Sequence, residues 1–123
     1  SVLMKISLLL LLAVWGAAPA MASTVNIRSC NDGDTCRTTA GERIRIACID
    51  APESGRAGSY AATLALRGMV QGKEVGIRRI TTDRYGRTVA ELTANGQNVG
   101  ESLVDQGHAW IYQRYAYQCR WAR

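Results

Sequence analysis

The stretch TCRTTAGERIRIAC, residues 35–48, carries the pattern that decides the fold. Residues 35–39 and 43–48 contain strand-forming side chains on either side of the turn signal Ala40-Gly41, so the stretch predicts a β-hairpin. In the second strand, isoleucine and cysteine alternate with arginine, which predicts one apolar and one basic face. A hairpin centred near Gly41 would set Cys36 opposite Ile46 and Asp34 opposite Cys48, close to Asp50 at one end of the sheet.

The rest of the chain predicts three more strands and two helices. We expect strands at residues 25–29, 73–80 and 87–93. A helix is predicted over residues 59–71, with Ala61, Leu64 and Ala65 on its apolar face and Gly72 just after its end. Asn98 and Glu101 predict a capped start to a second, short helix, which Gly107 ends. We expect His108 and Trp110 to pack at the end of this helix. Five strands with two helices predict an α+β fold, a β-barrel with helices of the five-stranded OB type.

The N-terminal residues 1–22 have the pattern of a secretory signal peptide. Lys5 precedes an apolar run over residues 6–15, and Ala20-Met21-Ala22 is a small-x-small cleavage site. The run is shorter than the roughly 20 apolar residues that span a bilayer. We therefore expect cleavage after Ala22, one domain over residues 23–123, a secreted or periplasmic location and no stable membrane association afterwards. A permanent N-terminal anchor is the alternative interpretation.

Charge and cysteine content fit an exported protein that meets polyanions. The net charge is +5, which favours partners such as nucleic acids. The four cysteines are an even number, as expected of disulfides in a small exported domain. A turn centred on Gly33 would set Cys30 opposite Cys36, so we predict a disulfide between them. Cys48 and Cys119 would then pair or stay free. A zinc site is the weaker alternative, because the sequence has a single histidine and no Cys-x-x-Cys.

Three short motifs place chemically active side chains beside turns. They are Asn31-Asp32-Gly33-Asp34-Thr35, Ile49-Asp50-Ala51-Pro52-Glu53 and Asp83-Arg84-Tyr85-Gly86-Arg87. Each alone is commoner as an ordinary turn or strand end. In this order within one small domain, and with Arg45, they supply oxygen ligands for a cation, a further carboxylate and two guanidiniums for phosphate. This set is typical of a metal-assisted phosphodiesterase.

With these motifs the chain, from about Cys30 to Tyr115, resembles the staphylococcal nuclease (thermonuclease) homologues, including the stretch from Val99 to Trp110. The resemblance implies a small OB-fold nuclease that depends on Ca²⁺ and acts as a monomer. Its substrates would be DNA and RNA, with little sequence specificity.

The resemblance also assigns roles to individual residues. Asp34, Asp50 and the main-chain oxygen of Ala51, where the family commonly has threonine, would hold the metal. Arg45, Glu53 and Arg87 would be catalytic: Glu53 would activate or orient the attacking water, and the two arginines would stabilise the charge that develops on the phosphate. Arg84, Tyr85 and Tyr115 would bind the nucleotide. At Gln113 the family has a second tyrosine, for which Tyr112 is the nearest substitute.

Two other functions stay open at this point. The first is a non-catalytic nucleic-acid-binding OB-fold module, against which the retained carboxylates and arginines argue. The second is a structural module stabilised by calcium. A nuclease assay with and without EDTA distinguishes these alternatives.

Overall fold

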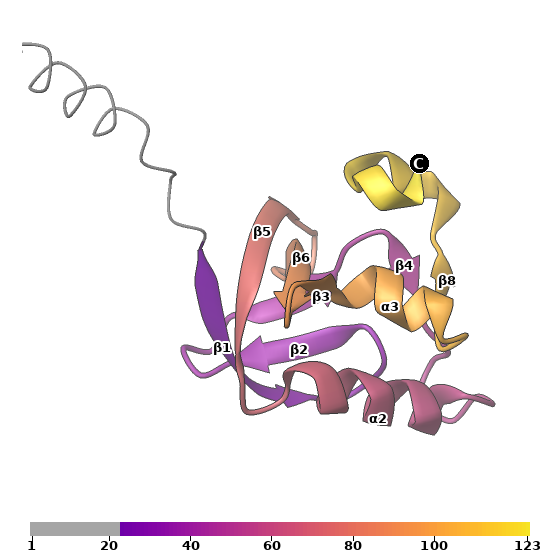
Figure 1. Ribbon diagram of the computed structural model, residues 1–123, viewed down its shortest axis with the longest axis horizontal. Helices are drawn as coiled ribbons and strands as arrows, with labels where there is room; N and C mark the ends of the chain where they lie inside the picture. Colours follow the sequence, from indigo (N-terminus) through magenta and orange to yellow (C-terminus); the bar gives the residue numbers. More distant parts are fainter. Residues whose placement is uncertain (1–22) are drawn as a thin grey trace, which may run out of the picture.

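The computed structural model describes residues 23–123, and the predicted signal peptide 1–22 lies outside the described residues. The strands are β1 (Thr24–Cys30), β2 (Thr35–Thr38), β3 (Arg43–Ile46), β4 (Ile49–Asp50), β5 (Glu74–Thr82), β6 (Thr88–Ala94), β7 (Gln97–Asn98) and β8 (Trp110–Ile111). The helices are α2 (Ser59–Val70) and α3 (Val99–Asp105), followed by the 3₁₀ helices η1 (Gln113–Gln118) and η2 (Arg120–Ala122). All lie in one domain (Figure 1).

Five of the strands close into a barrel, which confirms the predicted OB-type fold. The sheet runs in the order β3-β2-β1-β5-β6, and β6 also pairs with β3, which closes the ring. This closing pair is parallel, with Ile44 beside Thr88 and Ile46 beside Ala90, while the other pairs in the ring are antiparallel. The sequence predicted the antiparallel hairpin but not the parallel closure. The barrel interior is filled by fully buried side chains, among them Ile27, Ile44, Ile46, Leu66, Leu92 and Leu103.

The register of the β2–β3 hairpin differs from the prediction by two residues. Cys36 lies opposite Ile44 rather than Ile46, and Asp34 accepts a hydrogen bond at its main-chain oxygen from the N–H of Ile46, not Cys48. The turn explains the difference. The Thr38 N–H donates to the main-chain oxygen of Glu42, so residues 39–41 form a three-residue loop centred on Ala40. Gly41 takes the left-handed conformation (φ 88°) that a three-residue hairpin loop needs at its last position.

The first predicted helix is present, but it buries a different face. In α2 the buried side chains include Ala62, Leu66 and Val70, at i, i+4 and i+8, whereas Ala61 and Leu64 are exposed and Ala65 is half-buried. The apolar face that α2 buries against the barrel is therefore rotated by about one residue from the predicted face. In Figure 1, α2 runs along the bottom of the strands.

The second predicted helix is confirmed together with its cap. The Asn98 side chain accepts a hydrogen bond from the Glu101 N–H at 3.0 Å, and Gly107 has φ 79° just after the end of α3. The prediction for Trp110 was wrong: this side chain is 51% exposed. Trp110 instead lies in β8, where it pairs with Asp50 of β4. Successive side chains of a strand point to opposite faces, and the Trp110 side chain lies on the face that is exposed to solvent.

Two disulfides fasten the structure. Cys30 and Cys36 are bonded, as predicted, and are direct partners across β1 and β2. Cys48 and Cys119 form the second bond, which resolves the alternative left open by the sequence.

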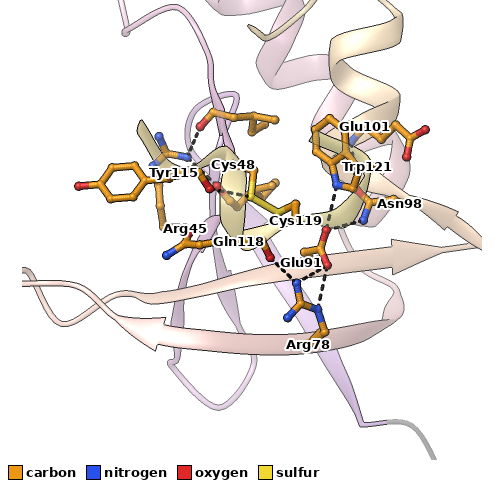
Figure 2. Close-up of a disulfide and its surroundings, with 12 residues drawn as sticks. Arg45, Cys48, Arg78, Glu91, Asn98, Glu101, Tyr115, Gln118, Cys119 and Trp121 are labelled. Carbon is orange, nitrogen blue, oxygen red and sulfur yellow. Dashed lines mark hydrogen bonds and ion pairs between the residues drawn. A yellow bond between two sulfur atoms is a disulfide. The ribbon is translucent and has the colours of Figure 1, made fainter. Parts of the chain in front are cut away.

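The second disulfide ties the C-terminal segment (residues 112–122) to the turn after β3 (Figure 2). Polar contacts around Glu91 hold the same segment: the Trp121 indole donates to Glu91 at 2.9 Å, and Arg78 bonds both Glu91 and the main-chain oxygen of Gln118. Within residues 23–123, no helix is long and apolar enough to cross a membrane.

Candidate active site

Asp34 and Asp50 meet at one end of the barrel, although Asp34 lies just before β2 and Asp50 is the last residue of β4. Each accepts a hydrogen bond from the N–H of Ala51, Asp34 through Oδ2 and Asp50 through Oδ1, both at 3.1 Å. A terminal nitrogen of Arg45 lies 3.5 Å from Asp34 Oδ2 and 3.4 Å from Asp50 Oδ1. One amide and one guanidinium therefore join the two carboxylates, which lie close together as predicted from the β2–β3 hairpin. We call Asp34 and Asp50 the acidic pair.

The turn after β3 lets Arg45 reach the acidic pair. Arg45 and Asp50 are an odd number of residues apart and would point to opposite faces of a regular strand. The chain leaves regular strand geometry between them, at Ala47-Cys48, where Cys48 has a φ of 70°. Arg45 braces this turn with hydrogen bonds from Nη1 to the main-chain oxygens of Ile46 and Ile49, at 2.7 and 2.9 Å.

Gly33 connects the acidic pair to α2. A β-carbon at this position would lie 2.8 Å from the β-carbons of both Ala51 and Ala62. Such a distance is too short for two carbon atoms, so only glycine lets the turn before Asp34 sit between the Ala51 segment and the helix. The conformation of this turn is further fixed by the hydrogen bond from the Asp34 N–H to Asp32 Oδ1 at 3.1 Å.

Burial raises the pKa of the Asp34 carboxyl from 3.8 to about 6. The Arg45 guanidinium and the Ala51 N–H act in the opposite direction, while the neighbouring Asp32 adds to the rise. The Asp34 side chain is only 13% exposed, so water compensates its charge poorly. Negative charge at the acidic pair is therefore not fully balanced by the protein.

This donor set fits a hard divalent cation. Two converging carboxylates whose charge is only partly balanced are the kind of ligand that Ca²⁺ or Mg²⁺ prefers. The N–H of Ala51, the residue predicted to supply a main-chain oxygen, donates to both of them. Among residues 23–123, no three His, Cys, Asp or Glu side chains gather into one metal-binding group. A cation here would have to complete its shell with water and substrate oxygens.

Glu53 lies outside the acidic pair, in the loop between β4 and α2. It is exposed, and its main-chain oxygen accepts from the Arg56 N–H at 2.9 Å in a tight turn. In the described part of the chain, its carboxylate forms neither a hydrogen bond nor an ion pair. Glu53 thus follows Asp50 by three residues with its carboxylate free for a ligand.

The predicted phosphate and nucleotide residues line one cleft of about 1000 Å³. Its walls include Arg45, Arg84, Tyr85, Arg87 and Tyr115. Arg45 is the link between this cleft and the acidic pair, because it lines the first and contacts the second. Figure 2 shows Arg45 and Tyr115 close to the Cys48–Cys119 bond.

On one side of the cleft, the β5–β6 turn holds Arg87 and Tyr85 in place. The Arg87 side chain pairs with Asp83 through Nε at 2.7 Å, and hydrogen bonds from Arg87 lower the pKa of Asp83 although its burial acts to raise it. The Tyr85 ring lies near both neighbouring guanidiniums, 4.8 Å from Arg84 and 5.3 Å from Arg87. Arg43 also donates to the Tyr85 main-chain oxygen. Arg87 keeps its terminal nitrogens for a ligand, since among the described residues the only hydrogen bonds that it donates come from its main-chain N–H and Nε.

The C-terminal segment forms the other side of the cleft and adds residues that the sequence did not single out. Arg114 and Tyr117 line the cleft beside Tyr115, and Tyr117 is 66% exposed. Tyr112, considered as a replacement for the family tyrosine, lines the cleft and packs edge-on against Tyr115 with ring centres 5.0 Å apart. Gln113 does not line it. The run of tyrosine and arginine in residues 112–117 was the signal that could have found this wall.

Comparisons with known proteins identify one family. The family described as "Staphylococcal nuclease homologue" matches residues 43–121, a range that includes every predicted site residue except Asp34. A protein of Haemophilus influenzae named "Uncharacterized endonuclease" is 36% identical over 115 residues, which cover 90% of this chain and 65% of that protein. A protein of Escherichia coli O157:H7 with the same name is 36% identical over 88 residues, which cover 68% and 58% of the two chains.

A third relative, from Shigella flexneri, is named "Micrococcal nuclease". It is 36% identical over 96 residues, which cover 68% of this chain and 55% of that protein. The chain thus spans between about half and two thirds of the length of these relatives.

Proposed function

The chain belongs to the staphylococcal nuclease homologue family, and from this premise we propose that it is a nuclease that hydrolyses phosphodiester bonds of DNA and RNA. The observation that carries the proposal is the position of Arg45. Its guanidinium lines the basic and aromatic cleft and also contacts both members of the acidic pair. A phosphate bound by Arg45 would therefore lie beside the carboxylates.

In the proposed mechanism, the two arginines bind and polarise the phosphate. Attack on a phosphodiester builds negative charge on the non-bridging oxygens, and fixed guanidiniums stabilise that charge more than they stabilise the ground state. Arg87 suits this role because its Nε is held by Asp83 while its terminal nitrogens are free. Arg45 is held as firmly, by two main-chain oxygens and the acidic pair.

Glu53 would accept the proton of the attacking water. Its exposed carboxylate has no protein partner among the described residues, so it can take up a proton without breaking an ion pair. A general base of this kind contributes about 10²–10⁴-fold in rate.

Asp34, Asp50 and the main-chain oxygen of Ala51 would hold a calcium ion. A bound divalent cation supplies positive charge that stabilises a phosphate as its negative charge grows. With only three protein oxygens, the site should bind calcium weakly, at Kd values on the order of 10⁻⁴–10⁻³ M, as in extracellular modules.

Substrate selection would rest on the cleft walls. Arg84 would contact phosphate, and Tyr85 and Tyr115 would contact the nucleotide. Contacts to phosphate carry no sequence information, so cleavage should show little sequence preference. We further propose that the protein acts as an exported monomer, secreted or periplasmic, after cleavage between Ala22 and Ser23. The intact mass of protein recovered from periplasm or medium tests the cleavage site.

A nuclease assay with and without EDTA tests the proposal. Purified protein should degrade single-stranded DNA and RNA in millimolar calcium, and EDTA should stop the reaction. Degradation that continues in EDTA would refute the metal dependence.

A second candidate is a non-catalytic nucleic-acid-binding module. It is favoured by one observation, that within the described chain no three metal-ligating side chains gather. Binding of oligonucleotides without cleavage at saturating calcium would establish this candidate and refute the nuclease.

A further inference from the structure

A second, smaller cavity lies beside α2, lined by a different set of residues from those of the cleft. Its volume is about 360 Å³. It is formed by Asn31 in the β1–β2 turn, by residues 54–56 of the loop after β4, and by Tyr60 and Arg67 of α2. None of the residues that line it is acidic. We call it the α2 cavity.

The α2 cavity and the acidic pair are built from the same two loops. The β1–β2 turn contributes Asn31 to the cavity and leads directly into Asp34, and the loop after β4 begins with Ala51 and contributes Arg56. Gly33 packs these loops against α2, because it approaches both Ala51 and Ala62. The cleft is connected to the acidic pair through Arg45, and the α2 cavity is connected to it through these two loops.

The side chains of the α2 cavity suit a phosphate and a base. Arg67 is oriented by the bond from its Nε to the main-chain oxygen of Cys30, at 2.8 Å. Within residues 23–123, neither Arg56 nor Arg67 forms an ion pair, so both guanidiniums can pair with phosphate. Tyr60 is 74% exposed, and an exposed aromatic ring beside two arginines is the arrangement on which single-stranded bases stack.

We propose that the α2 cavity is a second nucleotide subsite, which binds the part of a single-stranded polynucleotide that continues past the acidic pair. Arg56 and Arg67 would contact a phosphate and Tyr60 would stack on a base. This inference rests on the proposed function, since it assumes that a strand lies across the acidic pair. It goes beyond that function in requiring that the substrate extend over both cavities.

Binding in EDTA tests the subsite without any need for cleavage. Two probes are compared. One is a single-stranded DNA oligonucleotide longer than the roughly 4–16 nucleotides that one OB fold covers, and the other is a dinucleotide. Tyr60→Ala should weaken binding of the long strand by about 5-fold to 160-fold, the range for losing one stacked base, and Tyr60→Phe should restore it. Arg56→Ala should weaken binding and lower the slope of log K against log salt by about 0.7. The preference for the long strand over the dinucleotide should fall in both alanine variants.

Arg28→Ala is the matched control for charge, because Arg28 is exposed and lines neither cavity. It should keep the wild-type preference for the long strand. Equal losses in Arg28→Ala and Arg56→Ala, or a Tyr60→Ala protein with wild-type affinity, would overturn the subsite. If the long strand binds as predicted and the wild type does not cleave it in calcium, the subsite stands and the nuclease proposal fails. Circular dichroism checks that each variant is folded.

Discussion

Replacing Asp34 with asparagine should stabilise the metal-free protein. Burial raises the pKa of Asp34 to about 6, so at neutral pH the fold holds an ionised carboxylate that is more stable in water. Asparagine has the same shape, and its side-chain oxygen can still accept from the Ala51 N–H while its amide donates to the Thr35 hydroxyl. Asp34→Asn removes the charge and retains the hydrogen bonds.

The size and the sign of the effect follow from the pKa. A rise from 3.8 to about 6 is about two units, which corresponds to about 3 kcal/mol. The pKa of Asp34 is higher in the folded than in the unfolded state. Ionisation of Asp34 therefore does not lower the wild type's free energy of unfolding below about pH 3.8, but lowers it increasingly as the pH rises through 6. Asp34→Asn should therefore exceed the wild type by up to about 3 kcal/mol at pH 8 and match it at pH 3.5.

Urea unfolding in EDTA at several pH values measures this difference. Asp105→Asn serves as the control for net charge, since Asp105 is exposed at the end of α3, and it should change stability by less than about 0.5 kcal/mol. With calcium at about 100 times its Kd, the wild type should gain about 2.7 kcal/mol and Asp34→Asn much less. An Asp34→Asn protein that is no more stable than the wild type at pH 8 in EDTA would refute the argument that the ionised Asp34 carboxylate destabilises the folded protein.

Four further variants probe other parts of the site. Gly33→Ala should lower the free energy of unfolding by about 1–3 kcal/mol in urea unfolding, because its new methyl group overlaps two alanine β-carbons. Unchanged stability would contradict the close packing of Gly33 against Ala51 and Ala62. Glu53→Gln and Arg87→Ala should each lower kcat about 10²–10⁴-fold on single-stranded DNA, with no rescue by extra calcium, and near-wild-type turnover would exclude the assigned roles. Replacing Cys48 and Cys119 with serine removes their disulfide and should lower the free energy of unfolding by about 2–5 kcal/mol. It should also raise KM more than it lowers kcat. An unchanged KM would show that the C-terminal segment does not position substrate.

Local patterns predicted most of the fold. The alternation of isoleucine and arginine over residues 43–46, the Asn98 cap and the Cys30–Cys36 pairing depend on neighbours in the chain, and all are present. The parallel β3–β6 pair depends on strands distant in sequence and leaves no local signal. The hairpin register was missed because Ala40-Gly41 is compatible with two loop lengths, and only the Thr38–Glu42 bonding selects one.

The candidate site was predicted as a set of residues rather than as an arrangement. The predicted β2–β3 hairpin was enough to bring Asp34 and Asp50 together despite its two-residue error in register, because both residues lie beyond the open end of the hairpin. It could not show that Arg45 bridges them, since that depends on the unusual backbone of Cys48. The aromatic wall at Tyr117 was also missed, because it depends on a disulfide between residues far apart in the chain.

The parallel closure of the barrel has a consequence for when the site can exist. Ile44 and Thr88 pair across 44 residues of chain, and contacts of such long range form only after a large loss of chain entropy. Arg45 lies on one closing strand and Arg87 immediately precedes the other, so they share a cleft only once the ring is complete. A chain that is still unfolded would have both arginines and no cleft. If the proposed nuclease activity is correct, it would appear only once folding is complete, so an unfolded chain would not cleave nucleic acid.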